Sequence, residues 1–322
     1  MKKLVLISCY IGSLPNYFQL FLDSCSWNDT IDWIIYGDDD ISKFIFPSNV
    51  RFVNLTLNEL RELIHNKIGS FAKLKSAYKI CDYKPAYGLL FQKDITNYEY
   101  WGHCDLDIIW GDLKKFVLPL LEKNYDRLFK FGHLTIYKNN EETRNLFKRK
   151  YSGLNYKDVY KTSISCAFDE SRGTWILGKE NGINLYDGNI VFDIKRPGSS
   201  TKMECYGTNH ENQAFLIKSG KIIRIFEDDN KIREEEKAYL HFQWRNLLMF
   251  PKRLSKIDCY QFLGNKIKEI EDPSNVEIVF NNNLDPVKIT FKKRYKQINQ
   301  ILKFGLLKRK VKLYNKIFID KH

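Results

Sequence analysis

The chain has 322 residues, of which 43% are hydrophobic and 28% charged, so it is long enough and apolar enough for one large α/β domain with a substantial core. It contains no apolar run of 18 residues, and we therefore expect no membrane-spanning helix. The net charge is +13, but residues 288–322 carry twelve Lys or Arg and one acid, Asp320, so this tail holds +11 and the remainder is nearly neutral.

The N-terminal apolar run, residues 4–10, is short, and no clean small-residue cleavage site follows it. It therefore fits a buried first strand better than a signal peptide. The seven cysteines are scattered and include no CxxC spacing, which indicates reduced thiols and neither a disulfide framework nor a zinc site. We expect an unprocessed, cytoplasmic protein.

The first hundred residues alternate between strand and helix patterns. Strands are predicted at 3–11, 31–37, 50–56 and 98–105, and helices at 14–28, 57–68 and 71–84. This alternation predicts an α/β fold with a mostly parallel central sheet and flanking helices. Ligands of such sheets bind beyond the carboxyl ends of the strands, where the acids at 38–40 and at 105 and 107 follow.

The pattern after residue 116 is less regular. A strand is predicted within 126–139, followed by a short helix at 140–151 that Asn139 or Asn140 would cap. Residues 173–200 read as short strands and loops. Beyond them we expect a hairpin at 276–291 and one or two basic amphipathic helices at 293–319. The expected division is a catalytic domain at 1–250 and a C-terminal extension at 251–322.

Asp105 and Asp107, in the stretch "YWGHCDLDIIWGDL", form the strongest chemical signal. In an extended segment residues i and i+2 point to the same side, so the two carboxylates can converge on one cation. Two hard oxygen ligands with room for water and phosphate suit Mg²⁺ or Mn²⁺. Such a cation would neutralise charge on a leaving nucleoside diphosphate. The alternative is a solvated loop.

The strings "KPAYGLLF", "YEYWGHCDLDIIWGDL" and "FGHLTIYKN" resemble a bacterial family of GT-A glycosyltransferases associated with capsule and lipopolysaccharide gene clusters. The resemblance covers roughly residues 1–250. It implies a GT-A-like (Rossmann-like) fold and sugar transfer from a nucleotide-sugar donor, with a UDP-sugar as the first expectation, assisted by Mn²⁺ or Mg²⁺. It also implies a glycan or lipid-linked oligosaccharide acceptor.

The same resemblance implies a metal site. Asp105 and Asp107 match the DxD motif, and His241 matches the late histidine that completes the metal site or contacts the diphosphate in several such enzymes. The longer His-x-x-Gly-x-x-Lys-Pro string of many retaining enzymes is absent from this chain. The alternative for His241 is a core histidine on an aromatic strand.

Donor and acceptor residues are implied as well. Asp38 would bind the base or ribose, the backbone of Cys9, Tyr10 and Gly12 would line the same pocket, and Lys73 would reach the phosphates. The alternatives are a capped loop at 38–40 and a solvated helix face at Lys73. Asp169, and then Glu170, would be the base of an inverting reaction, and His133 would contact the acceptor. The alternative for these acids is a helix N-terminus, and a retaining reaction needs no such base.

The basic tail alternates lysines with apolar residues, which suits a helix lying on an anionic membrane surface at the inner face. The alternative is a helix packed on the domain. Two other functions stay open: a metal-dependent phosphodiesterase or nuclease, and a non-catalytic basic binding protein. Because the charge lies in one tail and not along a groove, and no nucleic-acid motif is present, we expect no nucleic-acid partner.

Overall fold

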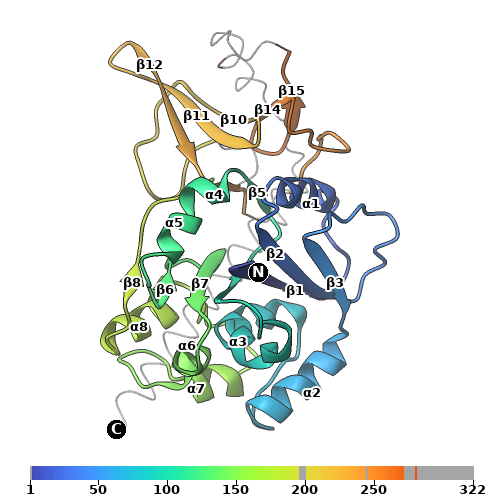
Figure 1. The fold of residues 1–322 in the computed structure, drawn as a ribbon, viewed down its shortest axis with the longest axis vertical. Coiled ribbons are helices and arrows are strands. Elements are labelled where there is room, and N and C mark those ends of the chain that lie inside the picture. The colour runs from blue at the N-terminus through green and yellow to red at the C-terminus, as the bar shows by residue number, and fades with distance from the viewer. Residues whose placement is uncertain (1, 196–200, 244–245, 272–279, 281–322) are drawn as a thin grey trace.

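The computed structural model describes residues 2–195, 201–243, 246–271 and 280 (Figure 1). Among these residues no helix has both the length and the apolar character needed to cross a membrane. The basic helices expected at 293–319 lie outside the described part, as does the hairpin at 276–291 apart from residue 280, so both stay predictions.

The centre of the fold is a seven-stranded sheet with the strand order β3-β2-β1-β4-β7-β6-β8. The four strands β3, β2, β1 and β4 are parallel to one another. Strand β7 runs antiparallel to both β4 and β6, and β6 is parallel to β8. The α/β fold with a mostly parallel central sheet is therefore confirmed. The seven strands are β1 (Leu4–Tyr10), β2 (Ile31–Gly37), β3 (Val50–Asn54), β4 (Tyr100–Cys104), β6 (Arg127–Leu128), β7 (Leu134–Lys138) and β8 (Leu185–Tyr186).

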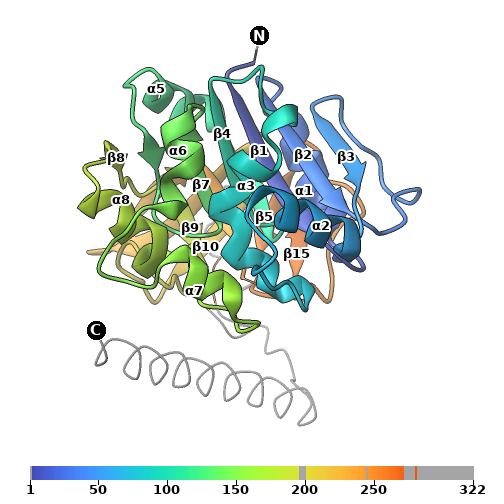
Figure 2. The same ribbon diagram turned by 90° about the horizontal axis from the view of Figure 1, so that it is seen from below.

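Strand β1 shows why the sheet is covered on both faces. Leu4 and Leu6 join one hydrophobic core with α1 (Phe18–Ser26), whereas Val5 and Ile7 join another core with α2 (Leu57–Lys67) and α3 (Tyr87–Leu90). Successive strand side chains point to opposite faces, so a run of apolar residues fits a strand buried on both sides. Figure 2 shows α2, α3, α6 (Glu141–Asn145) and α7 (Tyr156–Lys161) gathered on one face.

The prediction of a helix at 71–84 is wrong in the type of helix and in the residue at which it begins. Residues 71–76 are not helical, and a 3₁₀-helix, η1 (Ala77–Ala86), leads into α3. Pro85 lies inside η1 and has no N–H to donate to a carbonyl four residues earlier, which disfavours an α-helix there. The buried polar side chains of Lys79, Asp82 and Lys84 further separate η1 from a solvated amphipathic helix.

Short helices occupy the second half of the domain. The Asn140 side chain accepts a hydrogen bond from the Thr143 amide at 2.9 Å, so Asn140 caps α6, as one of the two expected candidates. Residues 176–180, expected in strands and loops, form a helix that follows a π-helical turn. The remaining helical segments are η2 (Gln92–Asp94), α4 (Leu113–Phe116), α5 (Leu118–Leu121), η3 (Leu146–Lys148), η4 (Ser171–Trp175) and α8 (Ile176–Glu180).

A five-stranded antiparallel sheet, drawn at the top of Figure 1, has the order β12-β11-β10-β14-β15. Its β10 pairs with β14, so strands from both sides of position 250, the expected domain boundary, share this sheet. The boundary itself stays a prediction. The strands are β10 (Gln213–Lys218), β11 (Lys221–Asp228), β12 (Lys231–Lys237), β14 (Cys259–Phe262) and β15 (Ile267–Glu269).

A three-stranded sheet joins segments that are far apart in the sequence. Its central strand, β13 (Tyr239–His241), pairs antiparallel with β5 (Ile108–Trp110) and parallel with β9 (Val191–Asp193). His241 is the register partner of both Ile108 and Asp193. This sheet therefore brings the segment after Asp107 next to His241.

Candidate metal and donor site

The two acids of the DLD stretch lie in the connection between β4 and β5. The backbone there bends at Leu106 and Asp107, so simple strand alternation does not describe how the carboxylates converge. The Asp105 amide instead donates to the His133 carbonyl at 3.1 Å, and the Phe242 amide donates to the Asp107 carbonyl at 3.0 Å. These two bonds fix the bend against β7 and the end of β13.

Asp105, Asp107 and His241 come together as the sequence led us to expect. Each offers one ligand atom, and these atoms all lie within 4.8 Å of one another. The Asp107 side chain is 5% exposed and that of Asp105 is 26% exposed, so the cluster is open on the Asp105 side. Two carboxylates and one imidazole are a donor set that fits Mn²⁺, and Mg²⁺ through its oxygen atoms.

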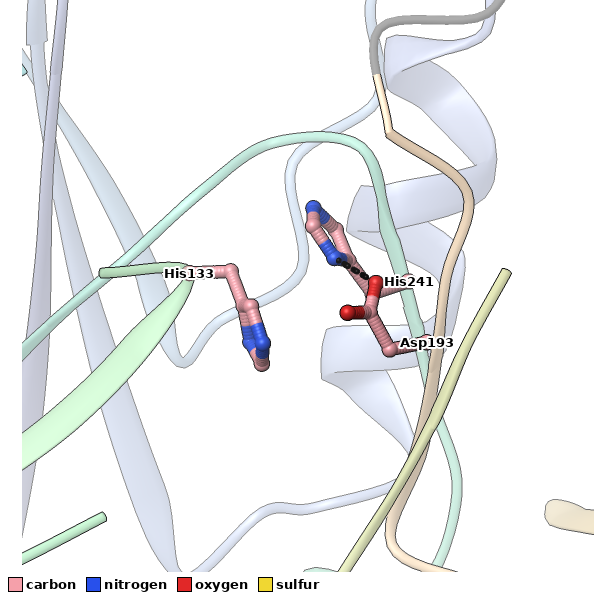
Figure 3. Close-up of side chains that lie close together, drawn as sticks. All are labelled: His133, Asp193 and His241. Atoms are coloured by element: carbon pink, nitrogen blue, oxygen red, sulfur yellow. Dashed lines mark hydrogen bonds and ion pairs between the residues drawn. The ribbon is translucent and has the colours of Figure 1, made fainter. Parts of the chain in front are cut away.

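His241 lies between two carboxylates. Its Nδ1 is 2.8 Å from Asp193 Oδ1 (Figure 3). Its Nε2 is 3.4 Å from Asp107 Oδ1. Burial by itself would lower the pKa of His241, but the charges of Asp107 and Asp193 outweigh it and raise the pKa to about 10. The imidazole therefore interacts with two carboxylates, and its choice between a metal ligand and a hydrogen-bonded core histidine stays a prediction.

His133 packs against this cluster. Its ring centroid is 4.4 Å from that of His241, and its Nδ1 is 3.0 Å from the Tyr239 hydroxyl. Burial, and then the charge of His241, lower the pKa of His133 to about 3, so its imidazole is neutral. The structure therefore places His133 beside the expected metal ligands, and its contact with an acceptor stays a prediction.

Lys84 is a site residue that the sequence pattern did not reveal. Its Nζ donates to Asp105 Oδ1 at 2.6 Å and to the Gly132 carbonyl at 2.9 Å, and it lies 3.0 Å from Asp169 Oδ2. Burial lowers the pKa of Lys84, but these carboxylates raise it well above its usual value. Lys84 therefore links the DLD stretch to the acids proposed for the acceptor side.

Asp169 and Glu170 precede η4, where the helix-terminus alternative also placed them. Asp169 is 3% exposed, and burial raises its pKa to about 7 although Lys84 opposes the shift. Glu170 is half-buried, accepts a hydrogen bond from the Gly132 amide at 3.2 Å, and also has a raised pKa because of burial. A Cβ on Gly132 would collide with both carboxylates, so a larger residue there would displace the Asp169 and Glu170 side chains.

The loops after β1 and β2 meet at the same edge of the sheet. Asp38 Oδ1 accepts a hydrogen bond from the Gly12 amide at 2.6 Å, and Gly12 has a φ of +99° that favours glycine. Asp38 therefore holds the loop after β1. This contact also agrees with the alternative interpretation of residues 38–40 as a capped loop. Burial raises the pKa of Cys9, whereas burial and then the charge of Asp107 raise that of Tyr10. The charge of Asp107 thus reaches Tyr10, and the binding of a donor by Cys9, Tyr10, Gly12 and Asp38 stays a prediction.

Lys73 lies apart from these groups. Its side chain is exposed, and no hydrogen bond or ion pair joins its ammonium group to another residue of the described part. Its backbone amide donates to the Tyr160 carbonyl at 2.7 Å, which places it beside α7. The role of Lys73 in binding phosphates stays a prediction.

The fold and the cluster define an α/β protein with a candidate divalent-cation site at the edge of its central sheet. The chain belongs to a family of unknown function, DUF6625, whose profile matches residues 6–271. No curated protein sequence matches it.

Three solved structures to which the chain is similar are sugar transferases. Mouse xyloside xylosyltransferase 1 in its apo form has 6% identity and a TM-score of 0.37, with 60% of this chain and 87% of that chain covered. The galactosyltransferase LgtC in complex with donor and acceptor sugar analogs has 10% identity and a TM-score of 0.34, with 59% and 75% covered. The glycosyltransferase GlyE of Streptococcus pneumoniae has 12% identity and a TM-score of 0.29, with 58% and 45% covered.

Proposed function

We propose that this protein is a glycosyltransferase that moves a sugar from a nucleotide-sugar donor to a glycan or lipid-linked acceptor in surface polysaccharide biosynthesis. The observation that carries the proposal is the convergence of Asp105, Asp107 and His241 at the carboxyl ends of β1 and β4. The loops after β1 and β2, joined by Asp38 and Gly12, border the same place and suit a nucleotide.

The position of each residue in the site determines the role that we propose for it. Asp105, Asp107 and His241 would hold the cation, and neutralisation of the charge on the leaving diphosphate is the chemistry that a bound Mn²⁺ or Mg²⁺ supplies. Lys84 fixes Asp105 by its 2.6 Å hydrogen bond. Tyr10, at 38% exposure, offers an aromatic ring at the edge of the donor site. A UDP-sugar is the first donor to test.

The acceptor side depends on two acids. An inverting reaction needs a carboxylate that takes the proton from the attacking hydroxyl, whereas a retaining reaction does not. Asp169 has a pKa near neutrality, which suits a base, but it is almost fully buried and paired with Lys84. Glu170 is the more exposed of the two, so its carboxylate reaches an acceptor with less rearrangement. We therefore place Glu170 beside Asp169 as the candidate base.

Donor hydrolysis tests the proposal. The purified chain is incubated with UDP-, GDP-, CMP- and dTDP-sugars in the presence of Mn²⁺, Mg²⁺ or EDTA, and release of the nucleotide is measured. We expect slow, metal-dependent release from one donor. The release should be lost in Asp105→Asn and Asp107→Asn and retained in Asp29→Asn, which removes an exposed carboxylate that forms an ion pair with Lys114. Cleavage of nucleic acid instead would favour a phosphodiesterase.

A further inference from the structure

We propose that Asp193 is a positioning residue that orients His241 so that its Nε2 atom faces the cation site. The inference rests on the proposed function, because it assigns a partner to one of the cation ligands. Asp193 belongs to no motif in the sequence, and it lies 86 residues beyond Asp107 in the chain.

The backbone of the three-stranded sheet sets up this arrangement. His241 is the register partner of Asp193 in the parallel pair of β13 with β9. The Ile194 amide donates to the His241 carbonyl at 2.9 Å, and the Phe242 amide donates to the Asp107 carbonyl at 3.0 Å. His241 and Asp193 therefore lie side by side on β13 and β9, and Asp107 lies directly before Ile108, the partner of His241 on β5. Ladder hydrogen bonds hold this arrangement in place.

The side-chain contacts identify which nitrogen is engaged. Asp193 Oδ1 is 2.8 Å from His241 Nδ1 (Figure 3). It also accepts a hydrogen bond from Gln243 Nε2 at 2.7 Å. The Asp193 side chain is 8% exposed, so little water competes for these bonds. With Nδ1 donating to Asp193, Nε2 is the nitrogen left to bind a cation, and it faces Asp107. A carboxylate on the second nitrogen fixes the ring and strengthens the imidazole as a ligand.

A second arrangement of the same residues is possible in principle. One ligand atom each from His133, Asp193 and His241 also lies within 4.8 Å of the others, so these three could hold an ion of their own (Figure 3). The contacts favour the orienting role, because Asp193 Oδ1 already accepts two hydrogen bonds and His133 Nδ1 already contacts the Tyr239 hydroxyl. The test below separates the two roles.

The first experiment measures the binding of Mn²⁺ alone. Electron paramagnetic resonance detects the free ion and so gives the Kd. Asp193→Asn removes the charge and keeps the shape, and we expect its Kd for Mn²⁺ to rise about 10- to 100-fold. Asp193→Glu keeps the charge and should bind more tightly than Asp193→Asn. The matched control is Asp94→Asn, because Asp94 also accepts from two side chains, Tyr36 and Arg51, but lies in η2. Its Kd should equal that of the wild type.

The second measurement reads the ring directly and needs no metal. In the wild type and in Asp94→Asn, proton NMR should show a protected downfield Hδ1 signal of His241, assigned by its loss in His241→Gln. The signal should disappear in Asp193→Asn. Nitrogen coupling to bound Mn²⁺, measured by electron spin-echo modulation, should weaken in the same variant. Circular dichroism verifies that each variant is folded. If Asp193→Asn is not folded, the comparison uses Asp193→Glu in its place.

Three outcomes would overturn the inference. The first is an unchanged Kd and an unchanged Hδ1 signal in Asp193→Asn. The second is a wild-type chain that binds two Mn²⁺ ions, one of which is lost in Asp193→Asn but retained in Asp105→Asn. That result would make Asp193 a metal ligand. The third is the absence of the Hδ1 signal from the wild type. A wild type that shows the Hδ1 signal but binds no Mn²⁺ would instead contradict the proposed function.

Discussion

At the scale of single residues, Lys84 decides how three buried groups coexist. Its ammonium group lies between Asp105 and Asp169, at 2.6 and 3.0 Å, and the lysine side chain is 8% exposed. Two carboxylates so close to each other repel, and the ammonium group between them offsets that repulsion. A residue that the sequence analysis placed only at the end of an expected helix therefore contributes to the electrostatics of the site.

Replacing Lys84 by methionine should destabilise the protein strongly. The variant leaves Asp105 and Asp169 without their buried partner, and breaking a buried ion pair in this way costs about 3–5 kcal/mol. Urea unfolding measures the change. The control is Lys114→Met, whose pair with Asp29 is exposed to solvent and should contribute little to stability. Equal stability of the two variants would mean that Lys84 is not a structural cation.

Asp169 predicts a pH dependence of stability with a definite sign. Its pKa is raised by burial from an ordinary value of about 3.9 to about 7 in the folded state. Between these pH values the unfolded chain loses the proton while the folded chain keeps it. The contribution of Asp169 is therefore fully present below about pH 4 and is lost as the pH rises toward about 7.

Comparing the wild type with Asp169→Asn isolates that contribution. The free energy of unfolding of the wild type, relative to Asp169→Asn, should fall as the pH rises from about 4 to about 7 and then level off. Chemical unfolding at several pH values measures it. A difference that is constant with pH, or that increases with pH, would contradict a raised pKa at this residue.

The site residues differ in how visible they are in the sequence. Asp105 and Asp107 could be named in advance because their string follows an expected strand, and His241 because the family resemblance implied a late histidine. Lys84 and Asp193 could not, because their contacts are formed only in the folded chain. Asp193 ends an ordinary apolar strand, and only the pairing of β9 with β13 brings it to His241. Local patterns do not encode such pairings.

At the scale of elements, η1 holds the loop that we propose for the acceptor side. Lys79 and Asp82 form an ion pair of 2.7 Å with fully buried side chains. Asp82 also accepts hydrogen bonds from the amides of Cys166 and Phe168, at 2.8 and 2.9 Å, and Lys79 donates to the carbonyl of Ile164 at 2.8 Å. This short helix therefore holds the loop that carries Asp169 and Glu170.

Substituting Asp82 should release that loop. In Asp82→Asn the pair with Lys79 loses its charge, and the two amides lose a charged acceptor. We expect hydrogen exchange at the amides of Cys166 and Phe168 to accelerate, whereas exchange in β1 stays slow because that strand is central. Residue-resolved exchange by NMR measures both. Unchanged protection at these two amides would show that the loop is held by other contacts.

Elements were predictable in proportion to their periodicity. The strands at 4–10, 31–37, 50–54 and 100–104 were found because apolar side chains fill them. The helix predicted at 57–68 is α2, and the structure adds that Thr56 and Glu59 form a capping box at its start. The prediction for 71–84 was wrong because this segment contains buried charges that form an ion pair in the folded chain, and a helical sequence pattern does not reveal such a pair. The three-stranded sheet was also invisible, because its strands have three residues each.

At the scale of the whole molecule, charge separates the body from the tail. Residues 288–322 carry +11 of the net +13 and lie outside the described part of the chain. We predict from the sequence alone that the full chain binds vesicles containing phosphatidylserine and does not bind neutral vesicles, and that added salt weakens the binding.

Charge variants of the full chain test this prediction by co-sedimentation. Replacing Lys308, Arg309 and Lys310 by glutamine should weaken binding by about 3 kcal/mol, at about 1 kcal/mol for each charge. The matched control replaces Lys43, Lys114 and Lys115, three exposed lysines of the body, by glutamine. Equal losses in the two triple variants would show that net charge, and not the tail, determines the binding.

The central claim is that Asp105, Asp107 and His241 hold a cation against a nucleoside diphosphate. Isothermal titration of UDP, GDP, CDP and dTDP, with Mn²⁺ and with EDTA, tests it most directly. We predict that at least one nucleotide binds only with Mn²⁺ and that Asp107→Asn abolishes this binding while Asp29→Asn preserves it. Binding that is the same in EDTA, or no binding of any nucleotide in Mn²⁺, would contradict the claim.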